Sequence, residues 1–184
     1  VAFNTPHSPM CVPDADWSRF AERPLRQRGP DIKKEDPVFT RAALAMVENL
    51  DENVGRILAA IDTAGVSRET IVVFFSDNGP NSQRWCGGMR GKKGSTDDGG
   101  TRSICCIRYP GQIASGVRLP QITGAIDLLP TLAGLTGVQL NSPKPLDGID
   151  LTAILKKETE EKSKSQKLGV KLAKRHIVAS QRGR

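Results

Sequence analysis

The sequence has few aromatic residues and lacks long apolar runs. Aromatic residues make up 4% of its 184 residues, and no run approaches the ~20 apolar residues that a membrane-spanning helix needs. It has four cysteines and two histidines, but no Cys-x-x-Cys pair and no His–Cys cluster. A zinc site and a membrane span are therefore not expected. With 38% hydrophobic and 26% charged residues, the composition is typical of a globular protein.

The sequence also lacks an initiator methionine and a signal peptide. Because Val1 opens directly into V-A-F-N-T-P-H-S-P, we expect the chain to be cut from a longer protein, so the missing signal says nothing about compartment. A chain of 184 residues is long enough for one domain of ordinary size and too short for two independent ones.

The net charge of +7 is concentrated near the C-terminus. Residues 156–184 hold ten Lys or Arg against three Glu, which accounts for the whole excess, while the residues before them are balanced. A Lys/Glu/Ser stretch of this kind is typical of a solvated surface segment, and an anion-binding arm is the alternative. We do not expect nucleic acid as a partner.

A long amphipathic helix is predicted from Asp36-Pro37, an N-cap followed by proline at the first helical position. Gly65 ends it after about 25 residues. Apolar residues recur at steps of three and four and predict one buried stripe, namely Leu44, Val47, Leu50, Val54, Ile57 and Ile61.

Strands are predicted at Thr70–Phe75 and Ile104–Tyr109, with the end of another at Val1–Phe3. Since Thr70–Phe75 shows no polar alternation, we expect a central strand covered on both faces. Residues 14–36 read as an irregular surface excursion. Alternating helices and strands indicate an α/β fold with a mostly parallel sheet.

Two further local features are predicted. Asp127 precedes a short helix whose inner side carries leucines and whose end is Gly137; the leucines are Leu128, Leu129, Leu132 and Leu135. Cys105 and Cys106 are adjacent inside an apolar run, where pairing with each other is strained, so we expect them to be buried as small hydrophobic residues.

Asp77 and Asn78 stand at the carboxyl end of the predicted strand, taken as residues 70–76. In open α/β sheets, ligands bind beyond the carboxyl ends of the strands. A carboxylate and an amide carbonyl are hard oxygen donors that suit Ca²⁺ or Mg²⁺. The alternative is an Asx turn that merely ends the strand.

Five sequence blocks in order resemble the formylglycine-dependent sulfatases. They are F-N-T-P-H-S-P (3–9), A-M-V-E-N-L-D-E-N-V-G-R-I-L (45–58), S-D-N-G-P (76–80), M-R-G-K-K-G-S-T-D-D-G-G-T-R-S-I-C-C-I-R-Y-P-G (89–111) and I-D-L-L-P-T-L-A-G-L-T-G-V (126–138). The resemblance covers residues 3–150. It implies an alkaline-phosphatase-like three-layer sandwich with a mostly parallel central sheet, whose N-terminal strands are missing from this chain.

The resemblance also implies roles for individual residues. Asp77 and Asn78 match the residues that hold part of a divalent cation site, Ca²⁺ in most members. Lys93 matches the lysine that reaches the sulfate oxygens, and His7 matches the histidine that contacts the ester near its bridging oxygen. Both would be catalytic and substrate-binding. A cation, an ammonium and an imidazolium aimed at the departing charge stabilise its transition state.

The sequence departs from the family pattern at several positions. Asp98 stands where glutamate is usual, Ile104 replaces a proline and Tyr109 a common tryptophan. We expect Asp98 and Arg102 to support the loop, and Gly94, Gly99 and Gly100 to permit its tight turns. Lys92 is expected to be a surface residue.

The family's nucleophile is not among these residues. Members use a cysteine in C-x-P-S-R that is oxidised to formylglycine, in a block N-terminal to everything present here. Cys11-Val12-Pro13 mimics its start but continues Asp14-Ala15 without the required arginine. We therefore expect this chain alone to be inactive, with formylglycine and further metal ligands in the missing half.

The sequence thus predicts a piece of a sulfatase, a sulfuric ester hydrolase acting on an aryl or carbohydrate sulfate. The alternatives are a phosphodiesterase or phosphonate hydrolase of the same superfamily, or a truncated non-catalytic module. Residues 1–150 would belong to the catalytic domain, and residues 151–184 would form a basic surface segment and the start of a small C-terminal sheet. Family habit implies a periplasmic or extracellular parent protein.

Overall fold

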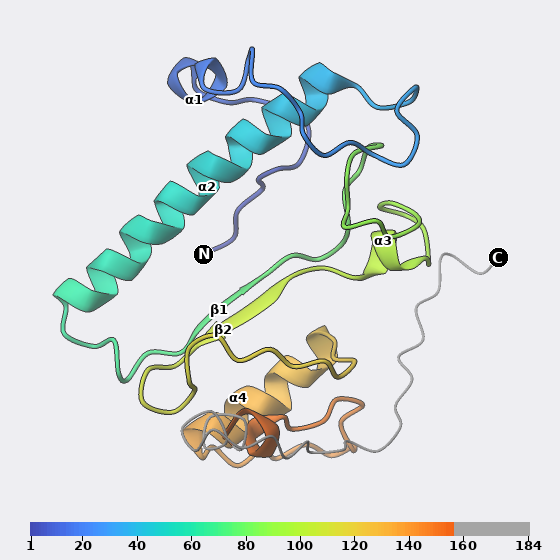
Figure 1. The fold of residues 1–184 in the computed structure, drawn as a ribbon. Helices are drawn as coiled ribbons and strands as arrows, with labels where there is room; N and C mark the ends of the chain where they lie inside the picture. Colours follow the sequence, from blue (N-terminus) through green and yellow to red (C-terminus); the bar gives the residue numbers. More distant parts are fainter. Residues whose placement is uncertain (157–184) are drawn as a thin grey trace. The chain divides into compact units, whose positions relative to one another are not determined.

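The computed structural model describes residues 1–156, which form two units (Figure 1). One unit comprises residues 1–67 and 73–106, and the other comprises residues 68–72 and 107–156. Residues 157–184, which include most of the predicted basic segment and the start of the predicted C-terminal sheet, lie outside the described residues. In residues 1–156 no helix combines the length and apolarity needed to cross a bilayer.

The longest element of the first unit is helix α2 (Pro37–Thr63). Its predicted start is confirmed, because the Asp36 carboxylate accepts hydrogen bonds from the backbone N–H groups of Val38 and Phe39, at 2.9 and 3.0 Å. Its predicted end is confirmed as well, since Gly65 follows with a φ of +72°. Both ends are determined by residues next to the helix in sequence.

The buried face of α2 differs from the predicted stripe. Leu50 is buried, but Leu44 and Val47 are 42% and 45% exposed. Ala42, Ala43, Ala45 and Met46 are buried instead. The periodicity correctly predicted a helix. The face that is buried by packing, however, lies next to the predicted stripe and carries smaller residues.

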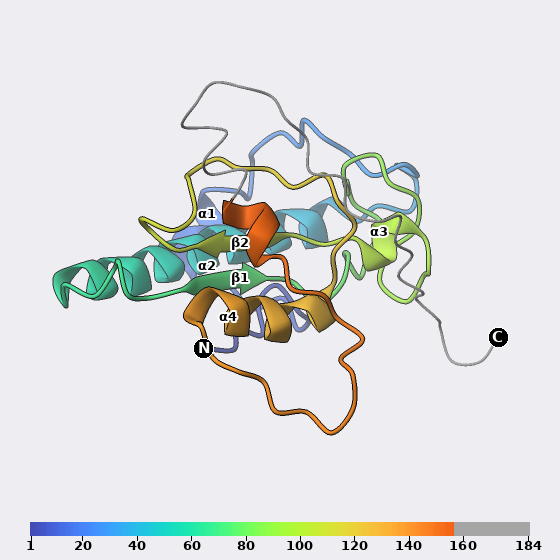
Figure 2. The ribbon, with the colours of Figure 1, turned by 90° about the horizontal axis from the view of Figure 1, so that it is seen from below.

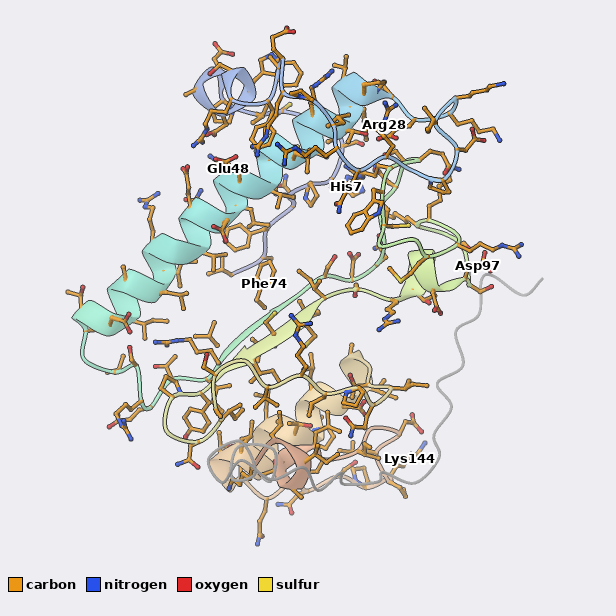
Figure 3. The ribbon with its side chains drawn as sticks, viewed as in Figure 1. His7, Arg28, Glu48, Phe74, Asp97 and Lys144 are labelled. Atoms are coloured by element: carbon orange, nitrogen blue, oxygen red, sulfur yellow. The ribbon has the colours of Figure 1, made fainter. Side chains whose placement is uncertain are left out.

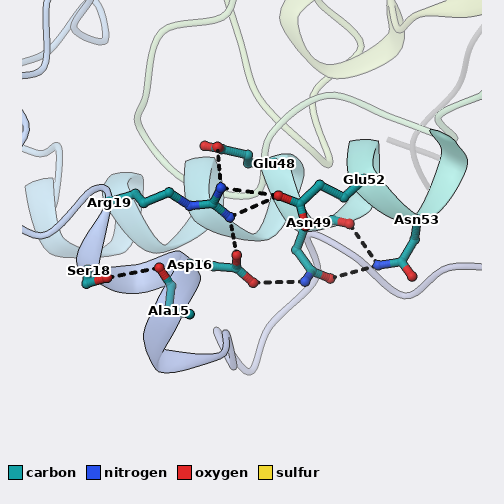
Figure 4. A network of polar contacts seen from close by, with 8 residues as sticks. All are labelled: Ala15, Asp16, Ser18, Arg19, Glu48, Asn49, Glu52 and Asn53. Atoms are coloured by element: carbon teal, nitrogen blue, oxygen red, sulfur yellow. Dashed lines mark hydrogen bonds and ion pairs between the residues drawn. The ribbon is translucent and has the colours of Figure 1, made fainter. Parts of the chain in front are cut away.

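A short helix, α1 (Asp14–Ser18), corrects the expectation that residues 14–36 are irregular. It packs on α2 through a polar network (Figure 4). Arg19 pairs with Asp16 and reaches across to Glu48 and Glu52, both at 3.1 Å. Asn49 Nδ2 donates to Asp16 Oδ2 at 2.8 Å. The buried Asp16 carboxylate thus has partners from both segments.

Strands β1 (Val72–Phe75) and β2 (Cys105–Arg108) form a two-stranded sheet. The end of β1 lies beside the start of β2, because Ser76 N–H donates to the Ile104 carbonyl at 3.1 Å. The two strands therefore run in opposite directions and lie side by side in both views (Figures 1 and 2). The described part is of the α/β class, while the mostly parallel sheet and the three layers stay predictions.

Coverage of the sheet is lower than the sequence predicts. Phe75 at the end of β1 is 50% exposed, and Cys105 and Cys106 are exposed rather than buried. Residues 1–3 form no strand. Apolar runs predict strands through β-propensity, but burial requires a covering layer that the described residues do not supply over these positions.

The second unit is built around η1 (Ala125–Asp127) and α4 (Leu128–Thr136). The predicted end at Gly137 is confirmed, with a φ of +73°. Of the four leucines expected on the inner side, only Leu135 is buried, and Leu129 is 55% exposed. Buried residues Leu135, Leu151, Ile154 and Leu155 form the core of this unit.

Two buried polar side chains fasten residues 149–152 to this helix pair. Asp127 accepts hydrogen bonds from the N–H groups of Gly124 and Ile149, both at 2.9 Å. Thr131 Oγ1 accepts from Leu151 N–H at 3.1 Å. The Asp-x-x-Pro-Thr pattern of residues 127–131 therefore has a structural role in this unit.

Candidate functional site

Asp77 and Asn78 follow the end of β1 after one intervening residue, Ser76, in the first unit. The backbone on either side of the pair is held by the returning chain: Ser103 Oγ donates to the Ser76 carbonyl at 2.6 Å, and Gly79 N–H donates to Gly100 O at 3.0 Å. Asp77 is exposed and Asn78 is half-buried.

Within residues 1–156 the side chains of Asp77 and Asn78 have no hydrogen-bond partner. An Asx turn would need a bond from one of these side chains to nearby backbone. The pair instead presents a carboxylate and an amide on a fixed backbone. Their oxygens are therefore available to a ligand.

Close backbone packing holds this strand end against the glycine-rich segment. A Cβ on Gly79 would lie 1.8 Å from the Gly99 carbonyl oxygen, and one on Gly100 would lie 2.3 Å from the Ser95 carbonyl oxygen. Side chains larger than hydrogen do not fit at either contact. Gly99 and Gly100 belong to the short helix α3 (Asp98–Thr101).

Lys93 is carried by the loop that packs on this strand end. Its backbone N–H donates to the Pro80 carbonyl at 2.8 Å, and Ser95 N–H donates to the Lys92 carbonyl at 2.8 Å. The Lys93 side chain is exposed, with no ion-pair partner among the described residues. The Lys93 ammonium group is therefore carried by a backbone that is bonded to Pro80, two residues after Asn78.

His7 comes from the N-terminal loop, which reaches the same region (Figure 3). Asn81 Nδ2 donates to Ser8 Oγ at 3.1 Å and joins positions 73 residues apart in the sequence. The His7 ring is exposed, and its Nδ1 lies 2.7 Å from the Ser8 carbonyl oxygen. The segments that carry His7, Asp77–Asn78 and Lys93 are thus brought together by Asn81 and Pro80.

Arg84 is a residue of this region that sequence reasoning missed. Its Nη2 donates to Asn81 Oδ1 at 3.0 Å, and its guanidinium lies 5.8 Å from the centre of the Phe39 ring. Burial lowers the pKa of Arg84 below the ordinary arginine value. Its only sequence signal was its place in the long loop from Asn78 to Gly100.

The acidic support of the loop is Asp97 rather than the predicted Asp98. Asp97 Oδ2 accepts from Ser95 Oγ at 2.7 Å and pairs with Arg90 Nε at 3.7 Å. Asp98 contributes its carbonyl, which accepts from Arg102 N–H at 2.8 Å. When two aspartates are adjacent, the sequence does not indicate which of the two side chains will bond to the loop.

Two hollows lie in the same unit. One of about 550 Å³ has apolar walls that include Met10, Trp17 and Phe39, and the exposed Cys11 lines it as well. The other, of about 370 Å³, lies between residues 30–31 and residues 83–92. The second hollow is bordered by the loop that carries Lys93.

The donor set fits part of a divalent cation site. No cluster of three or more His, Cys, Asp or Glu suited to a metal ion occurs within residues 1–156. Asp77 and Asn78 offer two hard oxygens, whereas Ca²⁺ takes about six to eight. They can therefore supply a minority of the ligands, together with an anionic ligand, water and other protein groups.

Comparisons with known proteins identify the family of the chain. A family model described as Sulfatase matches residues 1–138. Steryl-sulfatase from Mus musculus is 37% identical over 124 residues, which cover 62% of this chain and 20% of that protein. Arylsulfatase A from Homo sapiens is 42% identical over 111 residues, which cover 58% of this chain and 22% of that protein.

A solved structure has a similar fold. The crystal structure of Ps i-CgsB in complex with k-i-k-neocarrahexaose superposes with a TM-score of 0.71 and 28% identity, covering 85% of this chain and 33% of that one. The chain thus spans about a fifth of the curated relatives' length and a third of the solved structure's. With three quarters of its residues matched by the family model, the chain belongs to the sulfatase family.

Proposed function

We propose that this chain supplies part of the active site of a sulfatase, which converts a sulfate ester and water into an alcohol and hydrogen sulfate. The observation that carries the proposal is the meeting of three distant segments, through the Ser8–Asn81 and Pro80–Lys93 hydrogen bonds. Each segment presents a polar side chain that matches the family pattern, and those of Asp77, Asn78 and Lys93 are unpaired within residues 1–156.

The four residues have different tasks. Asp77 and Asn78 would hold a divalent cation, Ca²⁺ or Mg²⁺, whose positive charge would stabilise the anionic sulfate group. The Lys93 ammonium binds and orients the sulfate. His7 contacts the bridging oxygen and in its protonated form donates a proton to the departing alkoxide.

The nucleophile comes from elsewhere in the parent protein. Cys11 lines the apolar hollow and lacks the arginine that the formylglycine motif requires. We therefore expect formylglycine in a block outside this chain, and no turnover by the chain alone. Coding sequence upstream of Val1 that contains C-x-P-S-R or S-x-P-S-R with a nearby Asp-Asp would support this.

The substrate class follows from the relatives only in outline. The similar proteins include arylsulfatase A and an N-acetylgalactosamine-6-sulfatase, so we propose an aryl or carbohydrate sulfate as substrate. Similarity to sulfatases does not favour the phosphodiesterase alternative. A periplasmic or extracellular location for the parent protein is likewise a proposal.

Calcium binding tests the metal site without requiring turnover. Isothermal titration of the chain with Ca²⁺ in the presence of inorganic sulfate should give a dissociation constant that Asp77→Asn weakens at least about tenfold, because ligand charge sets calcium affinity. Asp98→Asn is the matched control, since it removes an exposed carboxylate from the same region. Equal losses in both variants, or none in Asp77→Asn, would contradict the assignment.

A further inference from the structure

The His7 ring makes a hydrogen bond that determines which of its two nitrogens is free. Its Nδ1 lies 2.7 Å from the Ser8 carbonyl oxygen, and a carbonyl oxygen can only accept a hydrogen bond. Nδ1 therefore carries a proton whenever this bond is made. In the neutral ring the lone pair is then on Nε2, and in the charged ring Nε2 holds the proton that can be transferred.

The position of Ser8 depends on Asn81. The backbone of this loop is turned by the hydrogen bond from His7 N–H to the Asn4 carbonyl at 2.8 Å, and Asn81 Nδ2 donates to Ser8 Oγ at 3.1 Å. An amide side chain has a donor end and an acceptor end, whereas a serine hydroxyl can both donate and accept. Ser8 alone therefore does not decide which end of the Asn81 amide faces it.

Arg84 selects the end of the Asn81 amide that faces Ser8. A guanidinium group has five donors and no acceptor, so it can bond only to the oxygen of an amide. Arg84 Nη2 donates to Asn81 Oδ1 at 3.0 Å. The amide nitrogen of Asn81 is therefore turned toward Ser8.

Arg84 itself is held from two sides. Its guanidinium lies 5.8 Å from the centre of the Phe39 ring, in helix α2. Its backbone packs against Gly29, where an added Cβ would lie 3.1 Å from the Arg84 backbone atoms. Gly29 N–H in turn donates to the buried Glu35 carboxylate at 2.8 Å. The Arg84 side chain thus begins on a fixed backbone and ends beside a fixed ring.

The stability of the fold does not account for an arginine at position 84. Arg84 is half-buried, and burial lowers its pKa. Within residues 1–156 it forms no ion pair, and its side chain donates one hydrogen bond, to Asn81. A desolvated charge without a carboxylate partner is less favourable than an apolar side chain of similar volume.

We propose that Arg84 is a positioning residue of the sulfatase reaction. It acts through Asn81 and Ser8 and holds the His7 ring so that Nε2 is free for the ester. The proposal rests on the proposed function of His7, and it adds the nitrogen that takes part and the residue that fixes it. Arg84 itself does not contact the substrate.

Nitrogen-15 NMR of the 184-residue chain measures the tautomer directly, because a protonated and an unprotonated ring nitrogen differ in chemical shift. The spectra are recorded above about pH 8, where an ordinary histidine is neutral. The other histidine of the sequence, His176, is the internal reference. Wild-type His7 should show a protonated Nδ1 and an unprotonated Nε2. The opposite tautomer would overturn the proposal.

Variants of Arg84 test its control of the ring. Arg84→Met removes the donor to Asn81 and keeps an apolar side chain beside Phe39. The ratio of the Nδ1–H to the Nε2–H tautomer should fall about fivefold, the equivalent of one hydrogen bond, while the urea midpoint should stay the same or rise. Arg84→Lys keeps a charged donor and should retain most of the ratio. Arg26→Met, at an exposed arginine of the same unit, is the control for loss of one charge.

Three results would overturn the positioning role. The first is an unchanged tautomer ratio in Arg84→Met. The second is an equal fall in Arg26→Met or in Arg84→Lys, since the effect would then not depend on the donor to Asn81. The third is an Arg84→Met chain that unfolds, because Arg84 would then serve the fold.

Phenyl sulfate distinguishes this role from the proposed function of His7. In calcium-containing buffer it should shift the Nε2 resonance of wild-type His7 more than the Nδ1 resonance. Unchanged resonances of both nitrogens, together with the expected fall in Arg84→Met, would overturn the proposed function of His7. They would leave the control of the His7 tautomer by Arg84 in place.

Discussion

At the scale of single residues, the region's organisation depends on a polar chain that runs from Arg84 through Asn81 to Ser8. Arg84 Nη2 donates to Asn81 Oδ1, and Asn81 Nδ2 donates to Ser8 Oγ. Each end of the Asn81 amide is therefore used once. Because Ser8 follows His7 directly, Asn81 positions the histidine loop, although it would not itself contact a substrate.

Asn81→Ala should loosen the His7 loop without unfolding the chain. Asn81→Ala removes two hydrogen bonds, to Ser8 and from Arg84, at about 1 kcal/mol each, and the ring resonances of His7 in an NMR spectrum should shift and broaden. Ser8→Ala removes only the bond from Asn81 and should shift the same resonances, and the double variant should shift them little further because both changes remove the Ser8–Asn81 bond. Asn141→Ala is the control, and unmoved His7 resonances in both single variants would refute the positioning role.

Glu35 is a buried carboxylate whose charge is fully matched. Its side chain has no exposed surface, and it accepts from Gly29 N–H at 2.8 Å, Arg28 Nε at 2.9 Å and Thr40 Oγ1 at 3.1 Å. Burial alone would raise the pKa of Glu35, but these donors and the Arg28 charge outweigh it, so the pKa lies below the ordinary value of 4.5.

The lowered pKa makes part of the stability pH-dependent. Because the folded pKa is below the unfolded one, the contribution is complete above about pH 4.5 and is lost as the pH falls through the folded pKa. Glu35→Gln should lower the free energy of unfolding by about 2 kcal/mol at pH 7, and the difference from wild type should shrink below pH 4.5.

Urea unfolding followed by tryptophan fluorescence measures this effect, since both tryptophans, Trp17 and Trp85, lie in the first unit. Glu22→Gln, which alters an exposed glutamate, is the control. A constant difference between wild type and Glu35→Gln from pH 7 to pH 3 would show that the Glu35 charge does not stabilise the fold.

At the scale of elements, residues next to a helix set its ends, whereas tertiary packing sets its buried face. The Asp36 cap and Gly65 set the ends of α2, but tertiary packing decides that Ala42 and Ala45, rather than Leu44 and Val47, are buried. In α4 the same division holds. Gly137 ends the helix, while Thr131 faces inward because it binds the returning chain at Leu151.

Thr131→Val should destabilise the second unit. The variant keeps the shape of the side chain but leaves the Leu151 N–H without its acceptor, and a buried unsatisfied group costs about 1–3 kcal/mol. Amide hydrogen exchange at Leu151 should accelerate accordingly. Thr136→Val on the same helix is the control, because it removes an exposed hydroxyl that donates to Leu132 O and should leave Leu151 exchange unchanged. Equal acceleration of Leu151 exchange in both variants would contradict a stabilising role for the Thr131–Leu151 hydrogen bond.

At the scale of the whole molecule, the chain contains only part of a sulfatase. It spans about a fifth of the curated relatives, yet it includes one strand end, one cationic loop and one histidine loop that meet in a single unit. Asp77 and Asn78 provide two ligands for a cation that takes about six to eight. The proposed catalysis therefore depends on groups that these residues do not supply.

The sequence by itself determined the features that depend on neighbouring residues: the ends of α2, the two strands, and the placement of Asp77 and Asn78 at a strand end. Capping, β-propensity and glycine's tolerance of positive φ act within a few residues, so a sequence displays them. The family resemblance added the candidate roles of His7 and Lys93, which stay predictions.

Only the tertiary structure decided which side chains meet. The bond from Asn81 to Ser8 joins positions 73 residues apart, and the inward turn of Asp97 rather than Asp98 depends on Ser95 and Arg90. Likewise, burial of one helix face depends on the segment that covers it. Such contacts arise from packing between remote segments, for which the residues themselves carry no local signal.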